Sequence, residues 1–349
     1  ALVVPGPGLL NASSGLGTAY AASSPVLLVS GQINVDKLGK KIGVLHEVDD
    51  QLDVVRPLTK WSRRVLRAPD VPAAVHEAFL QLRTDRPRPV EIEIPPDTLA
   101  EVADVELLDP GRTTPPAGDA ASLDRAAEAL AAAKRPVIWA GGGVISSGAS
   151  EALAELAELL QAPVITTPEG KGAISDHHYL SLGVPRGPTS AWTPTEPLRE
   201  FFEASDLVLA VGTRFAIAAP LEGQQVVQID IDHNEVGRNH AKTIGVVGDA
   251  ARALEEITER LRSSGLSRPS RKEEFEAMRA QRNSTIDDIQ PQGGFIQAIR
   301  QAMPEDGIFI SGMTQVGYYS RRHYPVYHPG TYITSSYFGT LCFAWPTAL

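Results

Sequence analysis

Three segments in the middle of the chain carry residue types that bind phosphate or ribose. Gly142 lies in a Gly-Gly-Gly turn after one apolar run, Arg214 follows a second such run, and Asp230 lies at the end of a third. Backbone amides of a glycine turn and a guanidinium group bind phosphate oxygens, and a carboxylate at a strand end is suited to ribose hydroxyls. These residues therefore predict a site for a nucleotide or another phosphate-containing ligand.

Gly142 and Asp230 also have purely structural interpretations. The glycines around Gly142 lack the Gly-x-Gly-x-x-Gly spacing of dinucleotide sites, so a tight turn between a strand and a helix fits them as well. Asp230 and Asp232 alternate onto one face of the predicted strand, where they could instead cap the turn that follows. His177 and His178 are adjacent and point apart without a third ligand, so we predict no metal site there.

Apolar periodicity around these segments predicts a doubly wound α/β domain over residues 121–262. The expected helices lie at 122–133, 150–160 and 249–261, and the expected strands at 136–140, 206–211 and 226–231. Parallel strands end at one edge of such a sheet, and ligands bind at that edge.

Similar patterns predict α/β structure on either side of the central domain. The first segment contains expected strands at 26–29 and 90–94 and a helix at 71–82, and the last begins with a helix at 294–303 and a strand at 307–311. The predicted division is a first domain at 1–100, a Pro- and Gly-rich linker at 101–120, the central domain at 121–262, a polar connection at 263–290 and a third domain at 291–349.

Charge and composition exclude several classes of partner. The 349 residues include 32 Lys and Arg against 42 Asp and Glu, a formal net charge of −10, which opposes attraction to nucleic acid. No run approaches the roughly 18 uncharged apolar residues of a membrane span, so no membrane partner is expected. The single cysteine, Cys342, suits a reducing cytoplasm and is expected in the core. Arg63, Arg64 and Arg67 are expected on a solvated rim.

A series of short motifs resembles the acetolactate synthase group of thiamine diphosphate enzymes, and the order and spacing of the motifs carry the resemblance. The motifs are Gly6-Pro7-Gly8 with Asn11, Ser30-Gly31-Gln32, Thr59-Lys60-Trp61, Arg88-Pro89-Val90, Gly170-Lys171-Gly172-Ala173, Asp206 through Gly212 to Arg214, Ile229-Asp230-Ile231-Asp232 with Glu235, Gly248-Asp249-Ala250, and Gly339-Thr340-Leu341 with Pro346. They span nearly the whole chain.

The resemblance implies three doubly wound parallel-sheet domains. The first binds the pyrimidine ring, the second is the central domain, and the third binds the diphosphate. Members of the group carry a glutamate before the Gly-Pro-Gly motif and a magnesium-binding Gly-Asp-Gly segment after the third-domain glycine. Residues 1–349 contain neither, so we expect the first and third domains to be truncated here.

The resemblance also places the cofactor between two half-sites. In the first, Gly6, Pro7, Gly8 and Asn11 would lie against the pyrimidine ring, with Gln32 also on the cofactor side. The segment from Gly6 to Asn11 is expected to be a loop.

In the second half-site, the carbonyl of Gly339 would accept a hydrogen bond from the pyrimidine amino group. Leu341 would hold the cofactor in a bent conformation. Thr340, between Gly339 and Leu341 in the sequence, belongs to the same half-site. His46 lies near the position of a catalytic glutamine in acetolactate synthases, which makes it a candidate catalytic residue. An ordinary surface position for His46 is the alternative.

By resemblance, we expect a lyase or carboligase that uses thiamine diphosphate and Mg²⁺ on a 2-oxo acid, assembled as a homodimer or homotetramer. The alternatives are a 2-oxo acid decarboxylase or aldehyde lyase of the same family, or an incomplete fragment whose central domain binds a nucleotide. FAD-containing members often have arginine where this chain has Ala73, and acidic residues where it has 216–218, so neither FAD nor ADP is a firm expectation.

Overall fold

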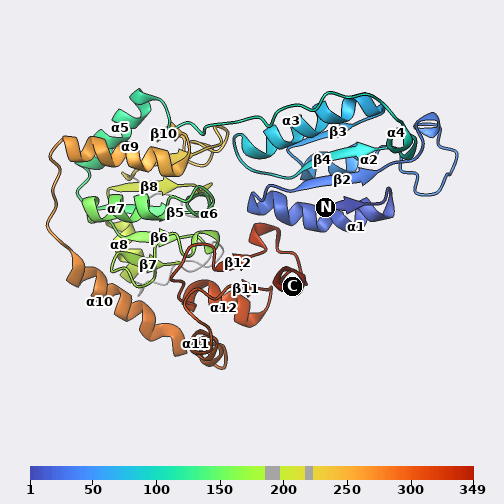
Figure 1. Ribbon diagram of the computed structural model, residues 1–349. Helices are drawn as coiled ribbons and strands as arrows, with labels where there is room; N and C mark the ends of the chain where they lie inside the picture. The colour runs from blue at the N-terminus through green and yellow to red at the C-terminus, as the bar shows by residue number, and fades with distance from the viewer. Residues whose placement is uncertain (185–196, 217–222) are drawn as a thin grey trace. The chain divides into compact units, whose positions relative to one another are not determined.

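The chain forms two compact units of parallel α/β structure (Figure 1). The computed structural model describes residues 1–184, 197–216 and 223–349, so residues 217 and 218 of the predicted central site lie outside the described residues. The first unit contains residues 1–115 and 335–340, and the second contains 116–334 and 341–349. In the described residues, no helix is long and apolar enough to cross a membrane.

The first unit is built on a four-stranded parallel sheet with the order β1-β2-β4-β3. The strands are β1 (Leu2–Val3), β2 (Leu27–Gly31), β3 (Trp61–Arg64) and β4 (Val90–Ile94), and the helices are α1 (Pro7–Ala22), α2 (Gln51–Val55), α3 (Val71–Arg83) and α4 (Pro96–Ala100). Short 3₁₀ turns are η1 (Val35–Lys37), η2 (Arg56–Leu58), η3 (Ala68–Asp70) and η6 (Ser336–Phe338).

Strand β4 pairs with β2 and β3 along its two edges, and all of its residues are buried because helices cover both faces of the sheet at this strand. Its apolar residues at alternate positions pack with Ala74 and Ala78 of α3. Glu91 and Glu93 lie on the opposite face, which is the face that α1 and α2 cover through Leu9 and Val55. Two completely buried carboxyl groups therefore sit beneath these helices.

The second unit contains a six-stranded parallel sheet with the order β10-β9-β8-β5-β6-β7. The strands are β5 (Pro136–Ala140), β6 (Val164–Thr166), β7 (Ser181–Gly183), β8 (Leu207–Val211), β9 (Gln225–Asp230) and β10 (Thr243–Val247). The helices that connect or cover them are α5 (Ala120–Ala132), α6 (Gly142–Ser146), α7 (Ser150–Leu160), α8 (Pro197–Glu203) and α9 (Ala250–Ser263), with the turn η4 (Pro168–Gly170). The order reverses between β5 and β8, as in doubly wound sheets.

The remaining part of the second unit is mostly helical. It contains α10 (Lys272–Asn283), η5 (Ser284–Asp287), α11 (Gln292–Ala302), β11 (Phe309–Ser311), α12 (Gln315–His323), β12 (Tyr332–Thr334) and α13 (Ala344–Ala348). β11 and β12 form a parallel pair, and a small core of Ile296, Tyr324, Val326 and Tyr332 lies beside them.

The predicted parallel α/β class is confirmed, and the predicted strand at 136–140 and helix at 150–160 have the predicted bounds. The expected loop from Gly6 to Asn11 is wrong, because Pro7 opens the 16-residue helix α1. Cys342 is exposed rather than part of the core. The three-domain division stays a prediction.

We expect Ile138→Ala to destabilise the second unit by about 2–5 kcal/mol, because it removes a completely buried side chain from a central strand. The matched change Ile308→Ala, at a side chain that is 58% exposed in the same unit, should cost less than about 1 kcal/mol. Urea unfolding followed by tryptophan fluorescence measures both. Equal losses would mean that the sheet core is not where this unit derives its stability.

Candidate active site

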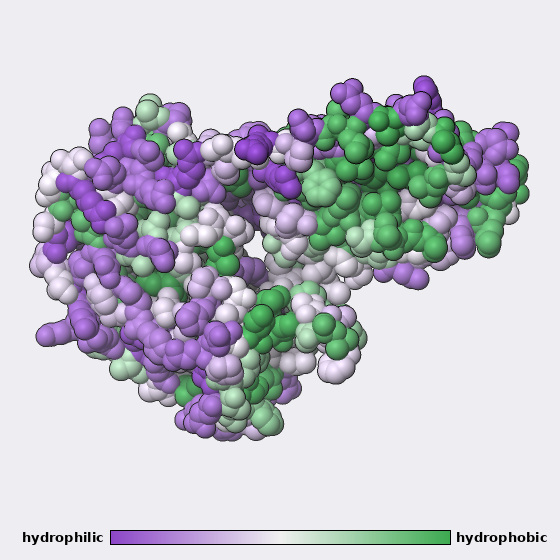
Figure 2. Space-filling view, viewed as in Figure 1, coloured by the Kyte–Doolittle hydropathy of each residue, from purple (hydrophilic) through white to green (hydrophobic). Residues whose placement is uncertain are grey.

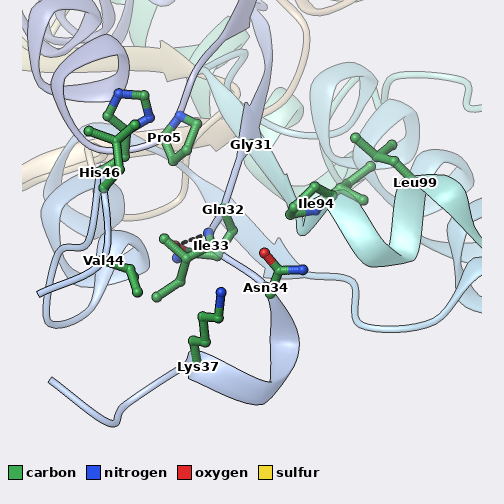
Figure 3. A pocket seen from close by; sticks show the side chains of 12 residues that line it. Pro5, Gly31, Gln32, Ile33, Asn34, Lys37, Val44, His46, Ile94 and Leu99 are labelled. Atoms are coloured by element: carbon green, nitrogen blue, oxygen red, sulfur yellow. Dashed lines mark hydrogen bonds between the residues drawn. The ribbon is translucent and has the colours of Figure 1, made fainter. Parts of the chain in front are cut away.

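A pocket of about 510 Å³ opens in the first unit where β2 and β4 end (Figure 3). It is lined by Pro5, Gly31, Gln32, Ile33, Asn34, Lys37, Val44, Leu45, His46, Ile94, Pro96 and Leu99. The carboxyl edge of a parallel sheet is the usual ligand edge of such folds, because the loops that follow the strands meet there. The pocket is therefore the candidate active site of this unit.

Apolar side chains form most of the pocket wall, and a few polar groups are spaced among them. The Gln32 side chain is buried, and its Oε1 accepts a hydrogen bond from the backbone N–H of Ile33 at 2.8 Å. Asn34, Lys37 and His46 supply the other polar side chains, and no Asp or Glu is among the lining residues. An apolar pocket with few polar groups is typical of a site for a small organic molecule.

Gly6 connects this pocket to the start of α1. Its φ of +58° lies in the left-handed region, and a Cβ atom there would come within 2.6 Å of the His46 carbonyl oxygen. Only glycine meets both demands. Among the described residues, no side chain caps the first turn of α1, where Pro7 and Asn11 are exposed. The predicted pyrimidine-binding residues therefore occupy a helix N-terminus. Gly6 N is bonded to Gln51, Pro7 has no N–H and Leu10 N is bonded to the Gly6 carbonyl, so the uncapped backbone N–H groups there are those of Gly8 and Leu9.

Gln51 is the buried residue that holds Gly6 in place. Its Oε1 accepts a hydrogen bond from Gly6 N at 2.6 Å. Its Nε2 donates to the Gly31 carbonyl at 2.9 Å and to Glu93 Oε2 at 3.2 Å. The side chain is 0% exposed, so the loop after β1 and the ends of β2 and β4 share one hydrogen-bonded residue.

Arg64 completes this network on the side of β3. Its Nε donates to the buried Glu93 carboxylate, and its Nη2 donates to Asp50 Oδ1 at 2.9 Å. Asp50 also caps α2 by accepting a hydrogen bond from Leu52 N at 3.0 Å. The prediction that Arg64 lies on a solvated rim is wrong, because the register of β3 places it directly beside Glu93.

Glu91 is the second buried carboxyl group on this face of the sheet. Its Oε1 accepts a hydrogen bond from Ser30 Oγ at 2.5 Å, and its Oε2 has no hydrogen-bond partner in the described part of the chain. Burial raises the pKa of Glu91 to about 7, against the effect of the Ser30 hydrogen bond. The charge of Glu93 raises the pKa further, whereas Arg64 lowers it.

The structure places the second predicted half-site at the other end of α1. Thr340 Oγ1 lies 2.5 Å from Thr18 Oγ1, and Phe338 contacts Gly17 so closely that a Cβ there would clash with its ring. Gly339 ends η6 with a φ of +70°. Twelve helical residues rise roughly 18 Å, so Thr340 is far along α1 from Gly6. Leu341 is 72% exposed and is grouped with the second unit.

In the second unit, the glycine turn around Gly142 is occupied by backbone contacts. Gly141 N donates to the Val211 carbonyl at 2.9 Å, and Gly143 N donates to the Gly212 carbonyl at 3.0 Å. A Cβ on Gly143 would lie 2.6 Å from the Gly212 Cα. This geometry favours the tight-turn interpretation, and a phosphate contact by Gly142 stays a prediction.

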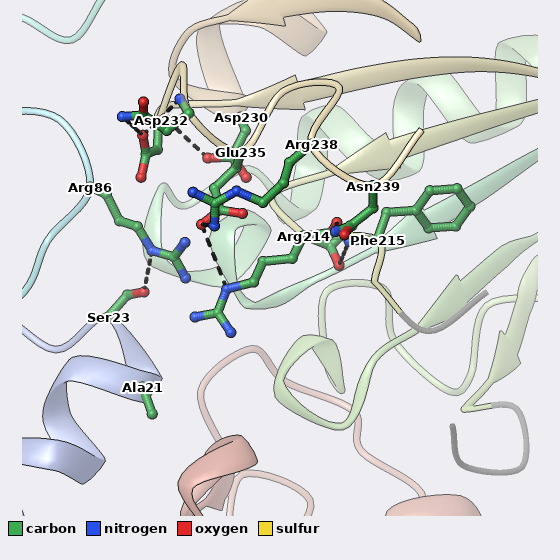
Figure 4. Close-up of polar contacts among 12 residues, drawn as sticks. Ala21, Ser23, Arg86, Arg214, Phe215, Asp230, Asp232, Glu235, Arg238 and Asn239 are labelled. Carbon is green, nitrogen blue, oxygen red and sulfur yellow. Dashed lines mark hydrogen bonds and ion pairs between the residues drawn. The ribbon is translucent and has the colours of Figure 1, made fainter. Parts of the chain in front are cut away.

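Arg214 and Asp230 lie at the carboxyl edge of the second sheet (Figure 4). Arg214 Nε lies 3.8 Å from Oε1 of the buried Glu235, which also pairs with Arg238 at 3.1 Å. Asp230 Oδ1 accepts a hydrogen bond from Asp232 N at 2.9 Å, which favours the capping interpretation. The strand ends at Asp230, so the predicted alternation of the two aspartates is wrong.

Lys171, from the Gly-Lys-Gly motif, is an unusual buried cation of the second unit. It is 3% exposed, and its ammonium nitrogen lies 5.5 Å from the centre of the Tyr332 ring. Burial lowers the pKa of Lys171 to about 8, although the charge of Asp176 raises it, and Arg282 lowers it further. In the described residues, no group of three or more His, Cys, Asp and Glu side chains is arranged to hold a metal ion.

Four residues in or beside the site were not predicted from the sequence: Lys37, Gln51, Glu91 and Glu93. The alternating Val-Glu-Ile-Glu-Ile run before Pro95 was the available signal for the two glutamates, because alternation places both on one face of a strand. Nothing in the local sequence around Gln51 shows that it meets Gly6, which is 45 residues away.

The chain is similar to thiamine pyrophosphate enzymes along much of its length. The family model of their central domain matches residues 123–257, and that of their N-terminal TPP-binding domain matches residues 1–54.

Three curated relatives illustrate the range of similar proteins. The chain is 32% identical to a Probable 2-ketoarginine decarboxylase of Pseudomonas aeruginosa, over 99% of this chain and 62% of that protein. It is 29% identical to the acetolactate synthase isozyme 3 large subunit of Escherichia coli K12, over 100% of this chain and 63% of that protein. It is 34% identical to the glyoxylate carboligase of Escherichia coli O157:H7, over 77% of this chain and 46% of that protein. The chain thus spans 46–63% of the length of these relatives.

We expect Gln51→Glu to destabilise the first unit by about 2–3 kcal/mol, because a carboxylate cannot donate to Gly31 and would repel Glu93. Gln81→Glu is the matched control. Gln81 donates to Glu77 Oε1 at 2.7 Å on the half-exposed surface of α3, so this change should cost less than about 1 kcal/mol. Urea midpoints at pH 8 provide the comparison, and similar shifts for both variants would contradict the bridging role of Gln51.

The raised pKa of Glu91 predicts stability that falls as the pH rises. The folded protein holds a proton that the unfolded chain releases near its ordinary pKa of 4.5. The linked free energy of unfolding therefore decreases between about pH 4.5 and 7, by about 3 kcal/mol in full. Glu91→Gln keeps an acceptor for Ser30 and carries no charge, so it should flatten this part of the profile. Parallel profiles for the two proteins, from urea unfolding at pH 4.5 to 8, would show that folding does not raise the pKa of Glu91.

Proposed function

The chain belongs to the thiamine pyrophosphate enzymes, and thiamine diphosphate is another name for that cofactor. We propose that the protein uses thiamine diphosphate to break or form a carbon–carbon bond of a 2-oxo acid. The pocket at the carboxyl edge of the first sheet, beside the accessible start of α1, is the observation that carries the proposal. The names of the three relatives, a decarboxylase, a synthase and a carboligase, support this class of reaction.

The residues of the first unit fit the pyrimidine end of the cofactor. In the first turn of α1 the uncapped backbone N–H groups of Gly8 and Leu9 are the available donors, because Pro7 has no N–H and Leu10 N is bonded to the Gly6 carbonyl, and Asn11 lies one turn further on. Gln51 fixes this turn through Gly6, so the donors are held before a ligand arrives. When bound, thiamine diphosphate supplies an electron sink for the reaction. The protein's contribution is to orient the substrate in the pocket and to limit its contact with water.

The described residues contain no group that fits the magnesium ion of the cofactor. No acidic cluster gathers among the residues that the structure describes, so we assign no Mg²⁺ ligand to this chain. Magnesium dependence is proposed from the family alone.

We propose a homodimer or a higher homo-oligomer as the active form. Gly6 and Thr340, one residue from each proposed half-site, lie near opposite ends of α1 within the first unit, so a second copy is needed to bring a Gly6 end and a Gly339 segment together. The first unit also presents an apolar face (Figure 2). Large exposed apolar side chains of this unit include Leu66, Val75, Phe79 and Leu99. Exposed apolar patches of this kind mark protein interfaces.

Decarboxylation and carboligation differ in what receives the acyl fragment. Release of an aldehyde from the 2-oxo acid would assign a decarboxylase, and a product that contains a second 2-oxo acid or aldehyde would assign a carboligase. No residue of the pocket decides between them. Catalytic assistance by His46, which lines the pocket, belongs to this proposal.

We expect Gly6→Ala to weaken thiamine diphosphate binding at least tenfold, because the new Cβ would meet the His46 carbonyl and shift the start of α1. Gly15→Ala is the control on the same helix, where a Cβ meets nothing within 4 Å. Quenching of tryptophan fluorescence by thiamine diphosphate with Mg²⁺ measures binding, and carbon dioxide release from a panel of 2-oxo acids measures activity. If the unmodified protein shows no binding of thiamine diphosphate and no turnover of any 2-oxo acid, the proposed function is rejected.

A further inference from the structure

Lys37 is the one Lys or Arg among the residues that line the described pocket. It ends the turn η1 (Val35–Lys37) and is partly buried. In Figure 3 its side chain extends towards Ile33 and Asn34, with the ammonium group at the pocket side. A cation that faces a mostly apolar pocket is a ready partner for an anionic ligand.

Two carboxylates close to this pocket are held by backbone groups. Glu47 Oε2 accepts hydrogen bonds from Gly43 N at 2.6 Å and from Val44 N at 3.1 Å. Asp97 accepts from Val35 N at 3.0 Å and 3.3 Å, at the start of η1. Neither acid lines the pocket, so the lining carries a positive charge without a facing carboxylate.

The backbone around Lys37 is fixed, which makes its ammonium group a defined feature of the pocket. Lys37 N donates to the Asn34 carbonyl at 3.0 Å, and Lys40 N donates to the Lys37 carbonyl at 3.2 Å. Ile33 is 7% exposed and anchors the segment at its beginning. These backbone hydrogen bonds hold the turn that carries the Lys37 side chain.

We propose that this pocket binds the carboxylate of a small organic acid through an ion pair with Lys37 Nζ, while the apolar walls hold the carbon chain. The proposal rests on the proposed function in one respect: it takes the acid to be the 2-oxo acid substrate. The carboxylate is either the one next to the oxo group or one at the distal end of a dicarboxylic acid. Both have the chemistry that Lys37 recognises.

The charge of Lys37 should set the affinity for acids and leave neutral ligands unaffected. An ion pair in a partly desolvated pocket with apolar walls is stronger than one in water, and salt screens it. Lys37→Met keeps most of the side-chain length and removes the charge, so the affinity for a 2-oxo acid should fall about tenfold, within the range of hydrogen bonds to charged groups. Lys37→Arg keeps the charge and should retain most of the affinity.

The test measures binding by calorimetry to the full chain at fixed ionic strength, with no thiamine diphosphate present so that nothing turns over. The probes are 2-oxobutyrate, 2-oxoglutarate and the uncharged 2-oxobutyramide. Lys40→Met is the matched control, because Lys40 is exposed on the same segment and does not line the pocket. We expect Lys37→Met to lose about tenfold in affinity for the acids and nothing for the amide, and Lys40→Met to lose nothing.

Each outcome decides the inference. Equal losses for both acids in Lys37→Met assign Lys37 to the carboxylate beside the oxo group, and a loss for 2-oxoglutarate alone assigns it to a distal carboxylate. Unchanged acid affinity in Lys37→Met, an equal loss in Lys40→Met, or no binding of either acid to the unmodified chain overturns the proposal. Acid binding through Lys37 in a protein that performs no carbon–carbon chemistry would reject the proposed function and the assignment of the acid as its substrate, and would leave the ion pair between Lys37 and a carboxylate standing.

Discussion

The hydrogen bonds of the buried Gln51 side chain hold together the part of the first unit on which the candidate site depends. One end of the carboxamide accepts from Gly6, and the other donates to Gly31 and Glu93. Glutamine is suited to this position because it presents an acceptor and a donor without a charge. The start of α1, the end of β2 and the end of β4 are thereby fixed to one another, and these ends form the rim and floor of the pocket. Binding chemistry at this edge therefore depends on a residue that does not line the pocket.

Most elements of the fold could be predicted from the sequence because their signals are local. The strand Pro136–Ala140 and the helix Ser150–Leu160 follow from an apolar run and a 3.6-residue period, and both agree with the structure residue for residue. The loop predicted from Gly6 to Asn11 is wrong, although Gly-Pro-Gly on its own favours a turn. Proline is also favoured at the first position of a helix, and the Leu- and Ala-rich residues that follow continue α1.

The site could be predicted only in part, because its polar contacts depend on strand pairing. The alternating run Val90–Ile94 predicts a strand, yet the burial of Glu91 and Glu93 arises from the helices that cover that face of the sheet. Arg64 and Glu93 are 29 positions apart in the sequence. Their pairing depends on the register of β3 against β4. Motif spacing can identify the neighbourhood of such a site, but not which polar groups are buried together.

The assignment of residues 335–340 to the first unit has a consequence for how the protein is made. These residues pack against α1 through Phe338 and Thr340, yet they are synthesised after the whole of residues 116–334. At roughly 5–20 residues per second, about 10–50 seconds separate the completion of residue 115 from the arrival of residue 340. During that interval the nascent first unit exposes the bare surface around Gly17. A chaperone that recognises apolar helix surfaces would have its clearest binding opportunity on the ribosome then, before the last segment covers α1.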